Sequence, residues 1–232
     1  MEIIGHRGSS GTHPENTLLG LETAVAAGAP WLEIDVRLAA GELFVIHDDT
    51  VDRTTNGSGS IYAMSAAEIH ALDAGAGQAI PTLAQVLDVV DAKASLNVEL
   101  KDTASMAPSL QLLENTLRKY PAWDQRLMVS TFEQSIHASL AEQMPNGALL
   151  GVLLNETSAS TPAYAAALGA YSLNLSFAQL DQQIVQVAHD HGLKVYVYTV
   201  NEPVQIDRCL SLAVDAIYTD FPARSLSYLA ET

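Results

Sequence analysis

Two carboxylates spaced two residues apart, Glu33 and Asp35, stand inside an apolar run early in the chain. Side chains alternate between the two faces of a β-strand, so both carboxylates point the same way. Their neighbours Trp31, Ile34 and Val36 are typical of a buried strand, where an unpaired carboxylate is costly. A hard divalent cation, Mg²⁺ or Ca²⁺, between the two carboxylates explains this pattern better than a solvated pair at a strand end.

A third carboxylate and a lysine lie on one face of a later predicted strand. Polar and apolar residues alternate there, so Asn97, Glu99 and Lys101 share a face. Strands of a buried parallel sheet are normally apolar along their whole length. The alternation therefore favours a functional site, and a structural ion pair between Glu99 and Lys101 is the alternative.

The first predicted strand ends in His6, Arg7 and Gly8, which combine three useful properties. Histidine exchanges protons near neutral pH, and arginine binds phosphate with its forked N–H groups. Glycine permits a sharp turn and a close approach of the backbone. The tripeptide is a weak signal alone, but it joins the strand ends that carry the carboxylates.

A hairpin brings a second histidine, His47, towards the carboxylates. The run 43–47 follows the second strand after a short turn around residues 40–41, which predicts a hairpin. In that register Asp35 faces Ile46 or His47. A polar loop is the alternative, but the proximity to the carboxylate pair favours a functional residue. The whole set predicts metal-assisted acid/base chemistry on a phosphorylated substrate.

Eight strands and eight helices alternate along the chain and position these groups. The strands are expected at 3–5, 31–38, 95–100, 127–130, 149–154, 171–175, 194–200 and 216–219, and the helices at 17–27, 82–90, 105–119, 133–143, 161–167, 181–191, 202–212 and 224–229. This alternation predicts a parallel sheet with helical crossovers. A closed (β/α)₈ TIM barrel leaves no edge strand and suits a single domain of 232 residues better than an open doubly wound sheet. The irregular stretch 48–78 is expected to be a functional loop at the C-terminal face of the barrel, where active sites lie.

The composition excludes several classes of partner. The chain has 11 basic and 27 acidic residues, a net charge of −16, and only 16% charged residues. Such a balance argues against binding to nucleic acid and against stable association with an anionic membrane. One cysteine, Cys209, excludes an internal disulfide. With no signal-peptide pattern and no apolar run of roughly 18 residues, a cytoplasmic location is the expectation.

These motifs resemble those of the glycerophosphodiester phosphodiesterases, a family of the phospholipase-C-like phosphodiesterase superfamily. The shared motifs run in order through almost the whole chain: His6-Arg7-Gly8, Pro14-Glu15-Asn16-Thr17, Glu33-Ile34-Asp35-Val36, His47-Asp48, Arg53-Thr54-Thr55 with Gly57 and Gly59, Ile80-Pro81-Thr82-Leu83, Val98-Glu99-Leu100-Lys101, Ser130-Thr131-Phe132, Tyr198-Thr199-Val200-Asn201 and 214–220. Two features depart from the family pattern. Tyr198 replaces the usual tryptophan, and the hairpin turn 38–42 lacks the usual Thr and Asp-Gly. Both bear on substrate preference more than on the class of reaction.

The resemblance implies hydrolysis of glycerophosphodiesters to sn-glycerol 3-phosphate and an alcohol, in glycerol and lipid metabolism. It implies that Glu33, Asp35 and Glu99 bind the cation, that His6 and His47 are the general base and general acid in an undecided order, and that Arg7 and Lys101 hold the phosphate. It also implies one domain over residues 1–232, in which the segment 48–78 is a small inserted subdomain over the active site.

Three alternatives stay open at this point. The first is a related phosphodiesterase of the lysophospholipase D type, acting on longer lipid-like substrates. The second is a metal-dependent binding barrel without catalysis, although such a protein needs no pair of histidines. The third, a barrel that binds a sugar phosphate, would normally carry a glycine-rich loop after the seventh or eighth strand, and residues 199–202 and 219–222 contain no glycine. The sequence does not specify the head group or the oligomeric state.

Overall fold

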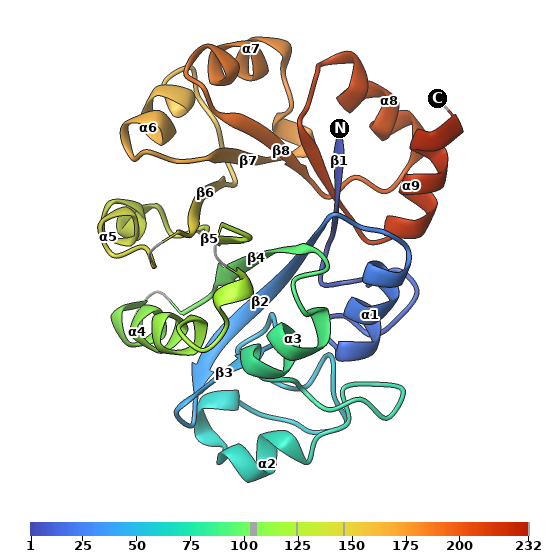
Figure 1. Ribbon diagram of the computed structural model, residues 1–232, viewed down its shortest axis with the longest axis vertical. Helices are drawn as coiled ribbons and strands as arrows, with labels where there is room; N and C mark the ends of the chain where they lie inside the picture. Colours follow the sequence, from blue (N-terminus) through green and yellow to red (C-terminus); the bar gives the residue numbers. More distant parts are fainter. Residues whose placement is uncertain (103–105, 124, 146, 232) are drawn as a thin grey trace.

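Eight parallel strands close into a barrel in the computed structural model, which describes residues 1–102, 106–123, 125–145 and 147–231. The strands are β1 (Glu2–Gly5), β2 (Trp31–Ala39), β4 (Ser95–Leu100), β5 (Leu127–Thr131), β6 (Leu149–Leu154), β7 (Ser172–Ser176), β8 (Lys194–Tyr198) and β9 (Ala216–Thr219). Each strand pairs with the next, and β1 pairs with both β2 and β9. In Figure 1 the blue first strand accordingly lies beside the red last segment of the chain.

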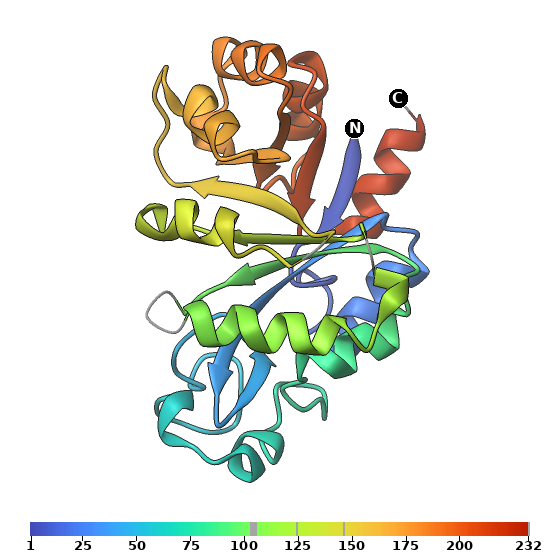
Figure 2. The same ribbon diagram turned by 60° about the vertical axis from the view of Figure 1, so that its left-hand side comes forward.

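A helix follows nearly every strand, and these helices cover the outside of the barrel (Figures 1 and 2). They are α1 (Leu18–Ala26), α3 (Leu83–Val90), α4 (Met106–Leu117), α5 (His137–Glu142), α6 (Thr161–Ala167), α7 (Gln182–Asp190), α8 (Pro203–Ser211) and α9 (Pro222–Glu231). Short 3₁₀ helices occur at Ile61–Ala63, Pro121–Trp123, Gln134–Ile136 and Phe177–Gln179. The predicted (β/α)₈ TIM barrel is confirmed.

The predicted boundaries differ from the observed ones by a few residues. The strand expected at 194–200 ends at Tyr198, and the helix expected at 133–143 begins as a 3₁₀ turn. There the Glu133 side chain accepts a hydrogen bond from the Ser135 backbone, which caps a tighter first turn. The helix expected at 105–119 is observed as α4, and residue 105 lies outside the described residues.

The interior of the barrel holds a polar floor beneath its C-terminal face. The Ser130 hydroxyl donates to Asn97 Oδ1 at 2.8 Å, and the Asn97 amide donates to the Tyr218 hydroxyl at 3.1 Å. Tyr218 in turn donates to Asn174 at 2.8 Å. All four residues are buried, so hydrogen bonding compensates the loss of their hydration. Asn97 thus belongs to the floor of the candidate site, below the carboxylate that follows it on the same face.

The hairpin and the segment after it form a separate layer beside β2. Strand β3 (Glu42–Val45) pairs antiparallel with β2 through a two-residue turn, and Val36 faces Val45. This register confirms the one deduced from the sequence, because the Ile46 amide donates to the Asp35 carbonyl at 3.0 Å. The predicted run 43–47 begins one residue later than β3 and extends two residues beyond its end. A small apolar cluster of its own holds this layer: Ala39, Phe44, Ile46, Val51, Ile61, Ile69, Ala74 and Ile80. Figure 1 shows it at the lower end of the molecule, with α2 (Ala66–His70) outermost.

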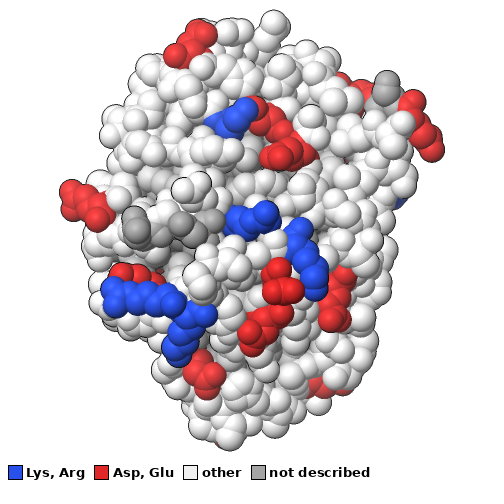
Figure 3. Space-filling view, viewed as in Figure 1, with Lys and Arg blue, Asp and Glu red and all other residues white. Residues whose placement is uncertain are grey.

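Most of the surface seen in Figure 3 carries neither acidic nor basic side chains, as the low charged share of the sequence predicts. Acidic and basic groups there lie next to each other in several places. Among the described residues no helix is both long and apolar enough to cross a membrane.

Candidate active site

A cavity of about 220 Å³ opens where the strands end, at the face of a TIM barrel that normally carries the active site. Its lining consists of His6, Arg7, Glu33, His47, Asn97, Glu99, Lys101, Phe132, Leu153, Tyr198, Thr199 and Tyr218. Six of the seven residues predicted to bind the cation or the phosphate or to transfer protons thus line one cavity. The seventh, Asp35, contacts two of them from a more buried position, as described below. A larger cavity of about 470 Å³, between Trp123 and Pro145, contains none of these groups.

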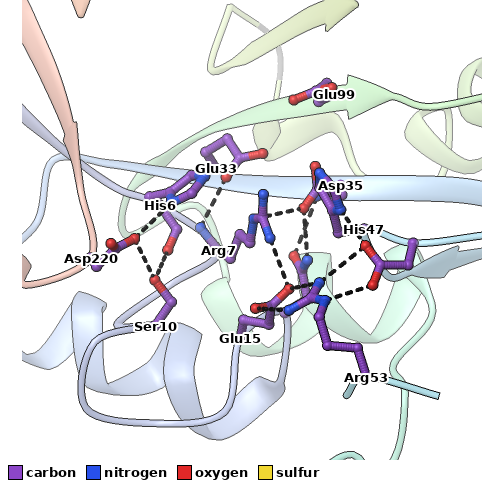
Figure 4. Close-up of polar contacts among 12 residues, drawn as sticks. His6, Arg7, Ser10, Glu15, Glu33, Asp35, His47, Arg53, Glu99 and Asp220 are labelled. Carbon is purple, nitrogen blue, oxygen red and sulfur yellow. Dashed lines mark hydrogen bonds and ion pairs between the residues drawn. The ribbon is translucent and has the colours of Figure 1, made fainter. Parts of the chain in front are cut away.

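Glu33, Asp35 and Glu99 form a compact, buried carboxylate cluster. Each offers an oxygen within 4.8 Å of the others, and the three residues are 3%, 1% and 6% exposed. The pairing of β2 with β4 produces the cluster, because Asp35 lies directly opposite Glu99 in the parallel register. Glu33 lies on the same face of β2, two residues before Asp35 (Figure 4).

The electrostatics of the cluster fit a divalent cation. Burial and repulsion from the neighbouring carboxylates raise the pKa of Glu33 well above its usual value and that of Glu99 to about 7. Burial would also raise the pKa of Asp35, but the cations Lys101 and Arg7 outweigh it and lower that pKa to about 2. Among the described residues, no group hydrogen-bonds to the buried Oε1 atom of Glu33. Three buried carboxylates with an unpartnered oxygen form a donor set suited to Mg²⁺ or Ca²⁺.

Lys101 and Arg7 act as counter-ions to this cluster. Lys101 Nζ lies 2.5 Å from Glu99 and 3.0 Å from Asp35. Arg7 Nε lies 3.1 Å from Asp35, and the Arg7 amide donates to Glu33 Oε2 at 2.9 Å. The two cations predicted to hold phosphate thus border the cavity, and some of their N–H groups already contact the carboxylates.

A tight turn after β1 brings the Arg7 amide to Glu33. Arg7 and Gly8 both have positive φ angles, 52° and 84°. A Cβ atom at Gly8 would lie 2.7 Å from the backbone of Gly20, so only glycine fits there. The close packing of this turn on α1 explains why glycine follows the histidine and arginine.

Each of the two histidines is paired with an aspartate through the same ring atom. His6 Nδ1 lies 2.7 Å from Asp220 Oδ1, and His47 Nδ1 lies 2.6 Å from Asp48 Oδ1. Hydrogen bonds from His6, Asn201 and Ser10 overcome the effect of burial and lower the pKa of Asp220; a hydrogen bond from Arg53 does so for Asp48. Because both carboxylates are ionised, each accepts the Nδ1 proton. That tautomer leaves Nε2 of each ring to exchange a proton in the cavity.

The comparison with known proteins agrees with this geometry. The model of the glycerophosphoryl diester phosphodiesterase family matches residues 6–224. The chain belongs to this family. The predicted enzyme class, a phosphoric diester hydrolase, is thereby confirmed.

Relatives and solved structures of the family cover nearly the whole chain. A glycerophosphodiester phosphodiesterase from Caldanaerobacter subterraneus is 34% identical over 95% of this chain and 94% of its own. A phosphodiesterase from Oleispira antarctica, solved in complex with the product sn-glycerol-3-phosphate, is 30% identical with a TM-score of 0.92, over 99% of this chain and 97% of its own. A putative family member from Silicibacter pomeroyi is 29% identical with a TM-score of 0.91, over 100% and 93% of the two chains.

Four charged residues at the site of this family member were not singled out from the sequence: Glu15, Asp48, Arg53 and Asp220. All four stand in motifs that the chain shares with the family, and Asp48 directly follows His47. The shared motifs were therefore the available signal. Residue spacing alone could not identify Asp220, because its partner lies at the opposite end of the chain.

One wall of the cavity is apolar and aromatic. The Phe132 and Tyr198 rings meet edge to face with their centres 5.4 Å apart, and Leu153 lies beside them in the lining. The Tyr198 hydroxyl donates to the Leu154 carbonyl at 2.7 Å, which holds the ring in place. Tyr198, the departure from the family pattern, thus forms part of the cavity wall.

Proposed function

We propose that this enzyme hydrolyses glycerophosphodiesters to sn-glycerol 3-phosphate and an alcohol, with Mg²⁺ or Ca²⁺ held by Glu33, Asp35 and Glu99. The observation that most strongly supports a bound cation is the buried carboxylate cluster, in which an oxygen of Glu33 has no hydrogen-bond partner among the described residues. The Oleispira antarctica relative, solved with sn-glycerol-3-phosphate, supports the same product. A role in glycerol and lipid metabolism follows from that product.

The charge balance of the site favours this substrate. A bound divalent cation would keep all three carboxylates ionised, and together with Lys101 and Arg7 it would leave the site with one net positive charge. When bound, the cation polarises a phosphoryl oxygen and offsets the charge that develops there. Arg7 and Lys101 are proposed to hold the remaining phosphate oxygens with the N–H groups that the carboxylates do not use. A small phosphodiester is thus compatible with an acidic protein.

His6 and His47 are proposed to move the protons. The Nε2 atom of one histidine takes the proton of the glycerol 2-hydroxyl, whose oxygen attacks the phosphorus. The bond from phosphorus to the alcohol oxygen breaks, and the other histidine protonates that oxygen. Water then opens the cyclic phosphate, and the proton it loses goes to the 2-oxygen as that bond breaks. The order of the two histidines is left open.

We further propose that residues 1–232 form one catalytic domain in which the segment 48–78 serves as an inserted subdomain beside the site. This segment contains Asp48, the partner of His47, together with Arg53. Its separate apolar cluster supports a small folded unit attached to the barrel through β3. No nucleic acid and no stable membrane association are expected.

Metal-stripped protein assayed on glycerophosphocholine, with Mg²⁺ or Ca²⁺ added back, tests the proposal. We expect sn-glycerol 3-phosphate to form only after addition of a cation, and its absence with both cations would refute the proposal. His6→Ala and His47→Ala should each lower kcat by at least about 10²-fold. Near-full activity of His47→Ala at saturating metal would exclude the two-histidine scheme.

The apolar wall formed by Phe132, Leu153 and Tyr198 favours one second candidate, a lysophospholipase D-type activity. Such a wall could accept a longer lipid-like substrate. Comparing kcat/KM for glycerophosphocholine with that for lysophosphatidylcholine distinguishes the two activities. A cavity of about 220 Å³ predicts preference for the smaller substrate.

A further inference from the structure

Arg53 joins two carboxylates that belong to different parts of the candidate active site. Its Nε and Nη2 atoms donate to the two oxygens of Asp48 at 2.6 and 3.1 Å. Its Nη1 and Nη2 atoms donate to the two oxygens of Glu15 at 2.8 Å each. Both contacts are bidentate, so the planar guanidinium fixes the orientation of each carboxylate relative to the other.

Each of these carboxylates also accepts a hydrogen bond from a residue with a proposed role in catalysis or phosphate binding. Asp48 Oδ1 accepts from His47 Nδ1 at 2.6 Å, and Glu15 Oε1 accepts from Arg7 Nη1 at 2.9 Å. An unbroken path of hydrogen bonds therefore runs from His47 to Arg7, and negative and positive groups alternate along it from Asp48 onwards. Figure 4 shows Arg53 at the centre of this path, with His47 on one side and Arg7 on the other.

The path joins segments that are distant in the sequence. His47, Asp48 and Arg53 lie close together after the hairpin, whereas Glu15 lies in the loop between β1 and α1, 38 positions before Arg53. The hydrogen bond from Arg53 is the largest influence that lowers the pKa of Asp48, so this partner of His47 stays ionised. Burial would raise the pKa of Glu15, but the hydrogen bond from Arg53 and the charge of Arg7 lower it as well. An ionised partner is what holds the imidazole in the tautomer described above.

We propose that Arg53 is a positioning residue that simultaneously sets the orientation of the His47 imidazole, through Asp48, and of the Arg7 guanidinium, through Glu15. This inference rests on the proposed function for His47 and Arg7. A surface arginine that only anchored the segment 48–78 would need one contact, whereas Arg53 uses four hydrogen bonds, all to these two carboxylates.

Arg53→Lys is the informative variant, because lysine keeps the charge and cannot form two bidentate pairs at once. We expect kcat on glycerophosphocholine to fall about 10–100-fold, the usual effect of losing a residue that orients a functional ligand. The pH dependence of kcat should also shift, because the tautomer of His47 is less firmly held. Glu15→Gln weakens the connection between Arg53 and Arg7 and leaves Asp48 as a partner of Arg53, so it should raise KM more than it lowers kcat.

A double variant separates positioning from anchoring. If Arg53 acts through Asp48, then Arg53→Lys should change kcat less than about 2-fold in an Asp48→Asn background. Losses in kcat that multiply in the double variant would overturn the proposal. Arg118→Lys is the matched control and should leave kcat unchanged, because Arg118 pairs with Glu114 at 2.7 Å near the end of α4 and neither residue lines the candidate active site.

Thermal unfolding of each variant completes the experiment. A lowered midpoint with unchanged kcat and KM for Arg53→Lys would show that Arg53 only anchors the segment, and would overturn the proposal. If Arg53→Lys does not fold, unchanged KM and kcat in Glu15→Gln would overturn it as well. A wild-type enzyme without activity on glycerophosphodiesters would refute the proposed function itself, whereas an active wild type with an unaffected Arg53→Lys would refute only this inference.

Discussion

The Nδ1 atom of His6 lies 2.7 Å from Oδ1 of Asp220, although the two residues are 214 positions apart. The first follows β1 and the second follows β9, and the pairing of these two strands closes the barrel. Asp220 is held in turn by the Ser10 hydroxyl at 2.8 Å and the Asn201 amide at 2.7 Å. The histidine–aspartate pair therefore forms only when β1 and β9 pair and the barrel closes.

Asp220→Asn should lower kcat on glycerophosphocholine by about 10²-fold, the scale on which acid/base groups contribute. The amide no longer requires the proton of His6 to reside on Nδ1, so Nε2 loses the protonation state that the chemistry uses. Steady-state kinetics at saturating cation provide the measurement. Asp190→Asn, at an exposed partner of Gln186 on α7, is the control and should retain full activity. Equal kcat values in wild type and Asp220→Asn would show that Asp220 does not orient His6.

Glu33→Gln should abolish the stabilisation that a divalent cation provides. Without a cation, this variant should unfold at the same temperature as wild type or higher, because it removes repulsion among buried carboxylates. Cation at about 100 times its Kd adds about 2.7 kcal/mol to wild type, which corresponds to roughly 5–10 °C for a chain of this size. Differential scanning calorimetry with and without Mg²⁺ or Ca²⁺ measures the shift. Glu114→Gln, at an exposed ion pair, should keep the full shift, and a full shift in Glu33→Gln would place the cation elsewhere.

Asp215 should contribute a pH-dependent part of the stability. It accepts hydrogen bonds from Lys194 Nζ at 2.8 Å, from the Val195 amide at 2.9 Å and from His189 at 2.8 Å. Burial would raise its pKa, but these donors outweigh burial and hold the pKa below its usual 3.8. A depressed pKa stabilises the folded state above the unfolded pKa, and the contribution is lost as the pH falls through the folded pKa.

The variant Asp215→Asn should therefore lower the free energy of unfolding by about 2 kcal/mol near neutral pH, the usual value for hydrogen bonds to a charged group. The difference from wild type should narrow as the pH falls below about 4. Urea unfolding of both proteins at about pH 6 and about pH 3 measures it. A difference that is equally large at both pH values would contradict the assignment of this stabilisation to the ionised carboxylate.

Ala40→Asn should stabilise the hairpin that brings His47 to the site. The two-residue turn between β2 and β3 places Ala40 at φ 47° and Gly41 at φ 83°, and non-glycine residues other than asparagine and aspartate seldom adopt such angles. We expect a gain of roughly 0.5–1 kcal/mol in the free energy of unfolding from Ala40→Asn and a comparable loss from Gly41→Ala. No atom lies within 4 Å of a Cβ built at Gly41, so the stability lost in Gly41→Ala would reflect backbone strain alone. Denaturant titration of both variants checks the opposite signs, and changes of the same sign would contradict this explanation.

Local sequence patterns were sufficient for the barrel, the carboxylates and the hairpin. Alternation along β2 and β4 specifies which side chains share a face, so Glu33, Asp35 and Glu99 could be placed together before the structure was known. The turn around residues 40–41 limits the register of β3, so Ile46 or His47 was expected opposite Asp35, and the structure selects Ile46. These properties depend on strand periodicity and turn length, which are encoded within short stretches of chain.

Only the tertiary structure decided how charge is distributed around these groups. Lys101 and Arg7 were expected to bind phosphate. In the structure Lys101 also forms ion pairs with Asp35 and Glu99, and Arg7 forms one with Asp35. Asp220, the partner of His6, and Glu15, a partner of Arg53, come from distant segments, and side-chain direction in loops follows no period that a sequence reveals. The sequence by itself determined that the histidines, carboxylates and cations at the ends of the first strands meet at one end of the barrel, because backbone periodicity is local. The fold determined which carboxylate each cation and each histidine contacts, because burial and pairing arise only when the barrel closes.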